Sequence, residues 1–146
     1  MNNSLTSNKL NVLNRESVSI INSISSDISQ LRTSLLESSL KTLKFNLNRK
    51  NKNNKFFEFG KIYEMINNKT TESKRLSVVF ANDLFNNTWN NKSASSDFYY
   101  LKNIILNIFS KLSINTTEKI INHDAFNNTL GLFHKKNNIA LIGDVK

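Results

Sequence analysis

Residues 31–50 read LRTSLLESSLKTLKFNLNRK, and the spacing of their leucines decides the first element of the fold. Apolar residues at steps of three and four lie on one face of a helix with 3.6 residues per turn. Asp27 with Gln30 has the pattern of a capping box, and Thr33 or Ser34 offers a second start just inside it. We expect the helix to end near Arg49, before a polar loop. Its apolar face is lined by Leu31, Leu35, Leu36, Leu40, Leu43 and Leu47.

The residues on either side of this helix have the patterns of strands. The short apolar run at 18–21 predicts a strand before the helix. Residues 56–65 are rich in aromatics and alternate past Gly60, and residues 75–81 hold a second apolar run. Together these two runs predict a β-hairpin whose loop is about six to eight residues long.

A second amphipathic helix follows the polar stretch at 82–96. Ser95, Ser96 or Asp97 would cap its start. Its buried face would be lined by Phe98, Leu101, Ile104, Ile105, Ile108 and Leu112.

Three short strands are expected after the second helix, at 118–122, 129–134 and 139–145. The order is then strand, helix, two strands, helix and three strands. Short connections between strands favour antiparallel pairing, and two helices are too few for a parallel sheet with a helix at every crossover. The sequence therefore predicts an α+β fold with a mostly antiparallel sheet flanked by two main helices.

The composition fits one domain and excludes several classes of site. A chain of 146 residues with 38% hydrophobic residues can bury a core of its own. The absence of Cys excludes disulfides, thiolate nucleophiles and Cys-ligated metals, and two His are too few for a His-rich metal site. Three glycines are too few for a phosphate-cradling loop. No apolar run approaches the ~20 residues of a membrane helix. The N-terminus also lacks a secretory pattern, so we expect a cytoplasmic protein.

The net charge of +9 has two interpretations. It is the electrostatic pattern of a nucleic-acid binder, and the chain would then be a stand-alone basic RNA-binding module. It is also what AT-rich codons produce, because they favour Lys and Asn over Arg, Pro and Gly. The candidates for RNA phosphate contacts gather where the first helix ends, but Phe56 and Phe57 are interpreted as strand core, which leaves this cluster without interleaved aromatics. The cluster consists of Arg49, Lys50, Lys52 and Lys55.

No arrangement of residues predicts a catalytic, cofactor-binding or metal site. Glu58 and Glu64 are expected on the solvated face of their strand rather than as an acid–base pair. His123 and Asp124 are adjacent, and adjacent residues of a strand point to opposite faces. Trp89 is expected to be a loop residue docked on the edge of the domain.

Several segments are each weakly specific for a protein family. Their order along the chain makes the combination more specific than any one of them. They are VSIINSISSD at 18–27, LRTSLL at 31–36, NLNRKN at 46–51, FEFGK at 57–61, Trp89, DFY at 97–99, LK at 101–102, His123 and IGDV at 142–145. In this combination the chain resembles the beta subunits of bacterial phenylalanyl-tRNA synthetases. It departs from that family's pattern at Ser23, Glu37-Ser38 and Asn103, where Pro or Gly is replaced. Losing Pro frees the unfolded chain, so we expect a domain less stable than its relatives.

The resemblance implies the antiparallel sheet and flanking helices of a class II aminoacyl-tRNA synthetase module without catalytic residues. Residues 1–17 would be a polar lead-in, and residues 18–146 would be the module, truncated at its C-terminus. The module would pack against the alpha subunit of an alpha2–beta2 enzyme that attaches phenylalanine to tRNA(Phe). That enzyme would use ATP and Mg, and this fragment would hold no cofactor itself.

The residues expected to have structural or interface roles lie on both helices, on the strand at 56–65 and, at Trp89, in the polar stretch before the second helix. Arg32 is the polar residue that we expect to be required for the structure at the first helix, because its guanidinium presents donors in a fixed fork. The full set is Arg32, Leu36, Leu40, Leu43, Leu47, Asn48, Arg49, Phe57, Glu58, Gly60, Trp89, Asp97 and Phe98.

Overall fold

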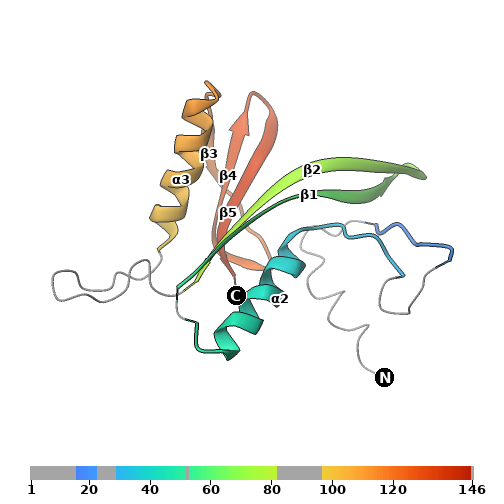
Figure 1. Cartoon of the computed structure of the whole chain (residues 1–146). Coiled ribbons are helices and arrows are strands. Elements are labelled where there is room, and N and C mark those ends of the chain that lie inside the picture. The colour runs from blue at the N-terminus through green and yellow to red at the C-terminus, as the bar shows by residue number, and fades with distance from the viewer. Residues whose placement is uncertain (1–15, 23–28, 52, 82–96, 146) are drawn as a thin grey trace. The chain divides into compact units, whose positions relative to one another are not determined.

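The computed structural model describes residues 16–22, 29–51, 53–81 and 97–145 (Figure 1). The chain divides into two compact units, residues 1–81 and 82–146. The first holds helix α2 (Leu36–Asn48) and strands β1 (Asn54–Ile66) and β2 (Lys69–Ala81). The second holds helix α3 (Phe98–Lys111) and strands β3 (Thr117–Ile120), β4 (Phe126–His134) and β5 (Asn137–Val145).

Strands β1 and β2 form one long antiparallel hairpin in the first unit. They pair along their full length, from Asn54 opposite Ala81 to Ile66 opposite Lys69. The predicted hairpin is present, but its predicted long loop is wrong. Asn67 and Asn68 alone make the turn, with φ of 51° and 60°. Asn tolerates this left-handed conformation, which a tight two-residue hairpin turn requires, so both strands extend further than the apolar pattern indicates.

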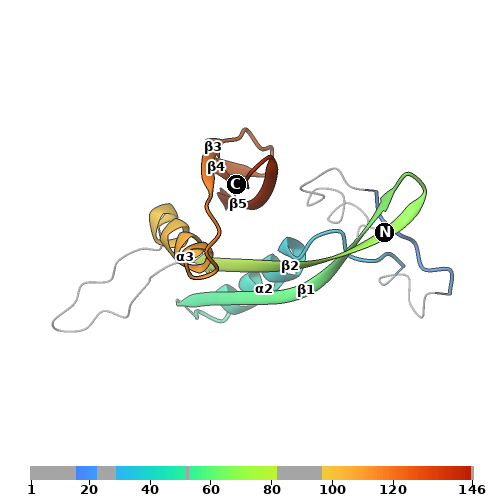
Figure 2. The ribbon, with the colours of Figure 1, turned by 90° about the horizontal axis from the view of Figure 1, so that it is seen from above.

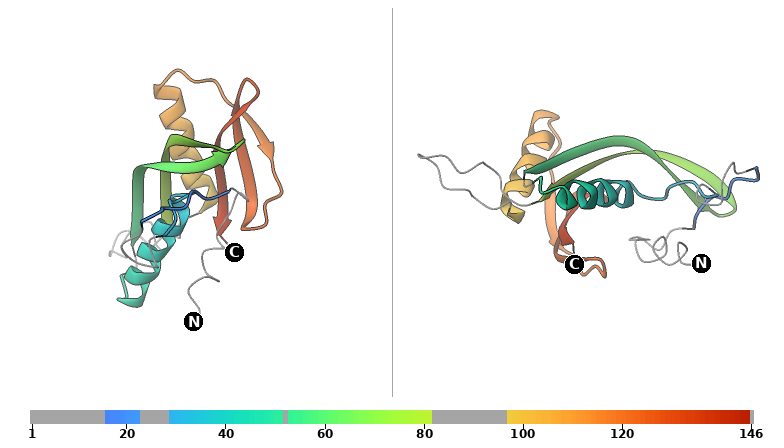
Figure 3. Two further views of the ribbon diagram at one scale, coloured as in Figure 1. Left: turned by 90° about the vertical axis from the view of Figure 1, so that its right-hand side faces the viewer. Right: turned by 60° about the horizontal axis from the view of Figure 1, so that its bottom comes forward.

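Helix α2 lies along one face of this hairpin, as Figures 2 and 3 show. Leu35 and Ile62 are buried between them. The helix begins later than the capping-box pattern predicts. Gln30 is not helical but forms a bridge with Ser19, and Asp27 lies outside the described residues. The second predicted start is closer, since Ser34 Oγ accepts the N–H of Leu36 at 3.1 Å.

The strand predicted at 18–21 is wrong. Two backbone hydrogen bonds join this segment to the chain before α2, from Ile20 N to Ser29 O and from Leu31 N to Val18 O. They make one isolated bridge between Ser19 and Gln30 and no ladder. A short apolar run becomes a strand only where a partner of matching length lies beside it.

Helix α3 packs on the sheet of the second unit. Strands β3, β4 and β5 pair in that order, all antiparallel. Their core is formed by Leu130, Leu132 and Ile142. The α3 residues that pack against it are Phe98, Leu101, Ile105, Leu106 and Phe109.

This packing shows that the prediction of the apolar face of the second helix is wrong in part. Leu112 is not part of it, because α3 ends at Lys111 and Leu112 is exposed. Leu106 and Phe109 pack on the core and were not predicted to do so. The three strands match the prediction within a few residues at each end.

The predicted α+β class with two helices and antiparallel strands is confirmed. Among the described residues the strands form two sheets, one of two strands and one of three. None of the helices in the described parts of the chain is both long and apolar enough to cross a membrane.

Candidate functional site

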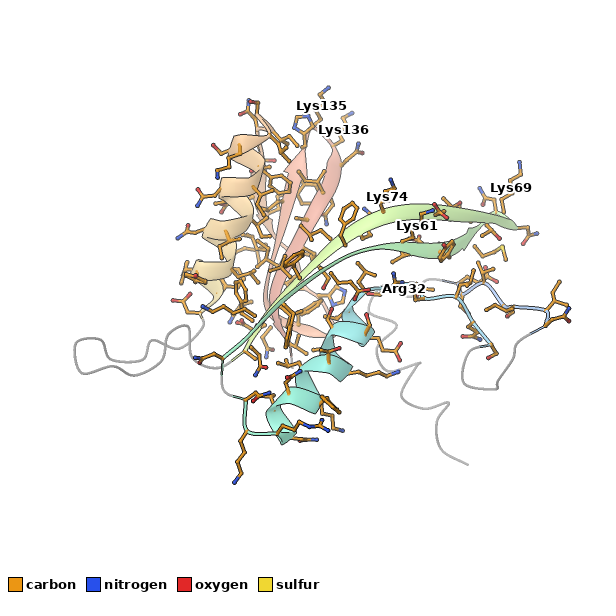
Figure 4. All side chains as sticks on the ribbon, in the orientation of Figure 1. Arg32, Lys61, Lys69, Lys74, Lys135 and Lys136 are labelled. Carbon is orange, nitrogen blue, oxygen red and sulfur yellow. The ribbon has the colours of Figure 1, made fainter. Side chains whose placement is uncertain are left out.

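Arg32 ties the segment before α2 to strand β1. Its Nε donates to the carbonyl oxygen of Lys61 at 2.8 Å, and its Nη1 donates to Oε1 of Glu58 at 2.6 Å. The N–H of Tyr63 donates to the carbonyl oxygen of Arg32 at 2.9 Å. A guanidinium holds its donors in a rigid fork, so it fixes a carboxylate and a carbonyl relative to each other. Arg32, beside the start of α2 in Figure 4, therefore sets where the chain enters the helix.

Glu58 connects the same point to α2 itself. Its second oxygen, Oε2, lies 2.8 Å from the hydroxyl of Ser38, which is also 2.9 Å from the carbonyl oxygen of Leu35. The exposed fraction of the Arg32 side chain is 43% and that of the Glu58 side chain is 31%. Water therefore screens the ion pair in part. The pair contributes more by fixing the positions of Arg32 and Glu58 than by electrostatic attraction.

Gly60 leaves room for the Arg32 side chain. A Cβ at this position would collide with Nη2 of Arg32 and lie 3.1 Å from Cδ2 of Leu35. We call Arg32, Ser38, Glu58 and Gly60 the Arg32 clamp. The sequence predicted structural roles for Arg32, Glu58 and Gly60, and the structure brings the three together. Arg32, however, precedes the helix instead of lying on it, and the predicted solvated position of Glu58 is wrong.

Ser38 is the member of the clamp that the sequence analysis missed. A Ser within an apolar–polar helix pattern gives no signal of its partner on a distant strand. Its neighbour Ser39 was also missed. Ser39 is the buried residue of α2, and its hydroxyl lies 3.2 Å from that of Ser77 on β2.

The leucine row of α2 does not point straight at the hairpin. A helix turns about 100° per residue, so Leu40 points well away from its buried neighbour Ser39. Leu36, Leu40 and Leu43 are partly exposed, and Leu47 is 38% exposed. The row therefore remains incompletely covered along the length of the helix.

The predicted candidates for RNA phosphate contacts lie on different elements around the end of α2. Arg49 caps the helix and places its guanidinium 3.4 Å from the centre of the Phe45 ring. Lys50 turns the chain with φ of 62°, and Lys55 lies on strand β1. Asn48 is the exposed last residue of α2, and Lys52 lies outside the described residues.

Phe57 is exposed, so its interpretation as strand core is wrong. Phe57 is 79% exposed and Phe59 is 69% exposed. Both lie on the face of the hairpin that is opposite to the face with Ile62, because side chains alternate along a strand. We call this surface the outward face of the hairpin. It carries Lys55, Phe57, Phe59, Lys61 and Tyr63 of β1 and Glu72, Lys74, Leu76, Val78 and Phe80 of β2.

Asp97 and Phe98 of the second unit lie where the pattern of the second helix predicts them. Asp97 caps α3 by accepting hydrogen bonds from the N–H groups of Tyr99 and Tyr100 with its side chain. Phe98 packs on the core of its unit. Trp89 lies outside the described residues.

The described residues contain few groups of side chains that could carry out chemistry. None of them forms a group of three or more His, Cys, Asp or Glu that could hold a metal ion. The Nδ1 atom of His123 accepts the N–H of Ala125 at 3.2 Å. On the outward face, Lys61 Nζ lies 2.7 Å from Glu72 Oε1. This hydrogen-bonded contact raises the pKa of Lys61 and lowers the pKa of Glu72.

Comparison with known proteins gives a consistent result over the whole chain. The family described as "Phenylalanyl tRNA synthetase beta chain CLM domain" matches residues 1–146. The phenylalanine--tRNA ligase beta subunit of Staphylococcus epidermidis is 33% identical over 103 residues, which are 69% of this chain and 13% of that protein. The corresponding chloroplastic subunit of Porphyra purpurea is 28% identical over 142 residues, 92% of this chain and 20% of that protein. The subunit of Carboxydothermus hydrogenoformans is 34% identical over 100 residues, 68% of this chain and 12% of that protein.

Proposed function

This chain belongs to the phenylalanyl-tRNA synthetase beta chain CLM domain family, and we propose that it serves as an assembly module for the catalytic alpha subunit. The chain spans a fifth or less of the length of the relatives above. The activity of a whole enzyme therefore enters only through the complex that the module would help to build. That complex would attach phenylalanine to tRNA(Phe) with ATP.

The incompletely covered leucine row of α2 is the observation that carries this proposal. Leu36, Leu40, Leu43 and Leu47 recur at helical spacing, yet the chain does not bury them fully. An apolar row on a helix costs free energy while it is exposed and stabilises a complex when a second helix covers it. A partner helix with a matching apolar face would supply that cover.

The Arg32 clamp gives the row a fixed orientation. Arg32 and Ser38 both hold Glu58, so the first turn of α2 is tied to β1 by side chains from two directions. A rigid, preorganised helix loses less conformational entropy on binding than a loosely held one. The clamp therefore supports binding without touching the partner.

The other parts of the proposal follow from the assembly role. ATP and Mg would be used by the assembled enzyme, which would also bind tRNA(Phe). We propose a cytoplasmic location for the protein. Fluorescence microscopy of the tagged protein tests this location.

Sedimentation velocity of the chain mixed with the alpha subunit of the same organism tests the proposal. We expect a complex with the native chain and a loss of that complex with the double variant Leu40→Ser, Leu47→Ser. Phe45→Ser is the matched control, because Phe45 is apolar and exposed but lies on the opposite side of α2 from the row. Equal association by all three proteins would contradict the proposal, as would phenylalanine-dependent ATP–pyrophosphate exchange by the chain alone.

A further inference from the structure

We propose that the outward face of the β1–β2 hairpin binds single-stranded RNA, with bases stacked on Phe57 and Phe59 and phosphates beside the lysines. The proposal concerns a surface different from the leucine row of α2. It therefore does not rest on the assembly role.

The two phenylalanines form a platform of the right kind. They are two residues apart on β1, so their rings lie on one face about 7 Å apart along the strand. Val78 and Leu76 are directly opposite them on β2 and border the rings. Sheets with two or three exposed aromatics on one face stack successive unpaired bases in a common class of RNA-binding module. Stacking needs exposed ring faces, and Phe57 and Phe59 are the most exposed phenylalanines among the described residues.

Positive charge lies at both ends of this platform. Lys55 is two residues before Phe57, and Lys61 is two residues after Phe59. Lys61 is also directly opposite Lys74 on β2. Two like charges opposite each other in a hairpin are unfavourable unless an anion lies near them.

Glu72 supplies one such anion, through its contact with Lys61 at 2.7 Å. It offsets one of the two positive charges at this end. Figure 4 shows Lys74 on the side of the hairpin away from Arg32 and α2. The net charge that remains at this end of the platform is positive, and it complements the negative charge of a phosphate backbone.

The combination favours a nucleic acid over a protein partner. Lysines are depleted in the cores of protein–protein interfaces, whereas here they border the aromatics directly. Grooves for single strands combine positive charge with stacking rings. The sequence pattern predicts Phe57 in the strand core and therefore indicates no aromatics among the basic residues. In the structure the exposed ring of Phe57 lies two residues from Lys55, so an aromatic side chain does lie among the basic residues.

Fluorescence anisotropy of a labelled single-stranded oligouridine, titrated with the whole chain at several salt concentrations, tests the proposal. We expect Phe57→Ala, Phe59→Ala to weaken binding about tenfold or more. Phe57→Leu, Phe59→Leu keeps the apolar area, removes the rings and should weaken binding as strongly. Lys74→Ala should reduce the slope of log affinity against log salt by about one.

Matched controls separate this surface from general effects of charge and aromatic content. Tyr99→Ala removes an exposed ring on α3, and Lys136→Ala removes an exposed lysine in the β4–β5 turn. Both should bind the oligouridine like the native chain, with circular dichroism spectra unchanged in all variants. Binding by the leucine variants equal to native would overturn the proposal, because stacking would not contribute.

A different outcome would reassign the face to a protein. If Phe57→Ala, Phe59→Ala keeps its affinity for oligouridine and loses its association with the alpha subunit, the proposal is wrong and the outward face is a subunit interface. If instead RNA binding is lost and association with the alpha subunit is kept, the proposal stands independently of the assembly role.

Discussion

Helices α2 and α3 are of similar length and both are amphipathic, yet they are held in place differently. Helix α3 is capped by its own Asp97, and its partly buried apolar side chains pack against Leu130, Leu132 and Ile142. Helix α2 has no side-chain cap at its N-cap residue, and its one buried residue is Ser39. Helix α3 thus packs on the core of its own unit, whereas α2 is positioned by polar contacts and leaves part of its leucine row exposed, the surface that we propose for the alpha subunit.

The largest stability effect should come from the core beneath α3. Leu132 is fully buried. Leu132→Ala should lower the free energy of unfolding by about 2–5 kcal/mol, because it loses apolar burial and leaves a cavity. Thermal unfolding followed by circular dichroism measures this change. Leu40→Ala on α2 is the comparison, and a loss as large as that of Leu132→Ala would show that α2 is a core helix as well.

The Arg32 clamp should give the next largest effect. Arg32→Ala leaves Glu58 without its guanidinium and should cost about 1–3 kcal/mol. Gly60→Ala should displace the same guanidinium because its Cβ would collide with it. Arg32→Lys is the control, since it keeps the charge and loses the fork of donors. Urea unfolding measures all three, and a native midpoint for Arg32→Ala would contradict the positioning role.

The cap of α3 should give a smaller change. Asp97→Ala should cost about 1 kcal/mol, because the N–H groups of Tyr99 and Tyr100 lose their acceptor. Asp97→Asn keeps an oxygen acceptor and should stay close to the native protein. Thermal midpoints of the two variants measure the difference. If Asp97→Asn is as unstable as Asp97→Ala, the charge matters more than the cap.

The exposed pair on the outward face should give the smallest effect, visible as a pH dependence. The pKa of Glu72 is lowered from 4.5 by the hydrogen bond from Lys61, so its stabilising contribution is present above pH 4.5 and is lost as the pH falls through the folded value. The pKa of Lys61 is raised from 10.5 by Glu72, so its contribution is present below pH 10.5 and is lost as the pH rises. Glu72→Gln should therefore differ slightly from the native thermal midpoint near neutral pH and converge with it in acid. A difference in thermal midpoint that grows in acid would contradict the lowered pKa of Glu72.

The features that the sequence predicted well are local ones. The cap at Asp97 and the spacing of the apolar residues in α3 depend on residues a few positions apart. The hairpin was predictable because its two apolar runs are neighbours in the chain. Its tight turn was missed because Asn67-Asn68 lacks Gly, which is the usual signal for left-handed turn residues.

The features that the sequence did not predict depend on distant partners. Arg32 and Glu58 are separated by 26 positions, and nothing in the spacing of either indicates the other. The alternation along β1 divides its residues into two faces but does not say which face α2 covers. Phe57 was therefore assigned to the core, and the structure assigns that place to Ile62.

Sedimentation velocity with the alpha subunit is the decisive experiment for the proposed interface on α2, because the substitutions change only the leucine row. We expect Leu40→Ser, Leu47→Ser to abolish the complex and Phe45→Ser to leave it intact, with both variants folded. A complex that survives the double substitution would contradict the account.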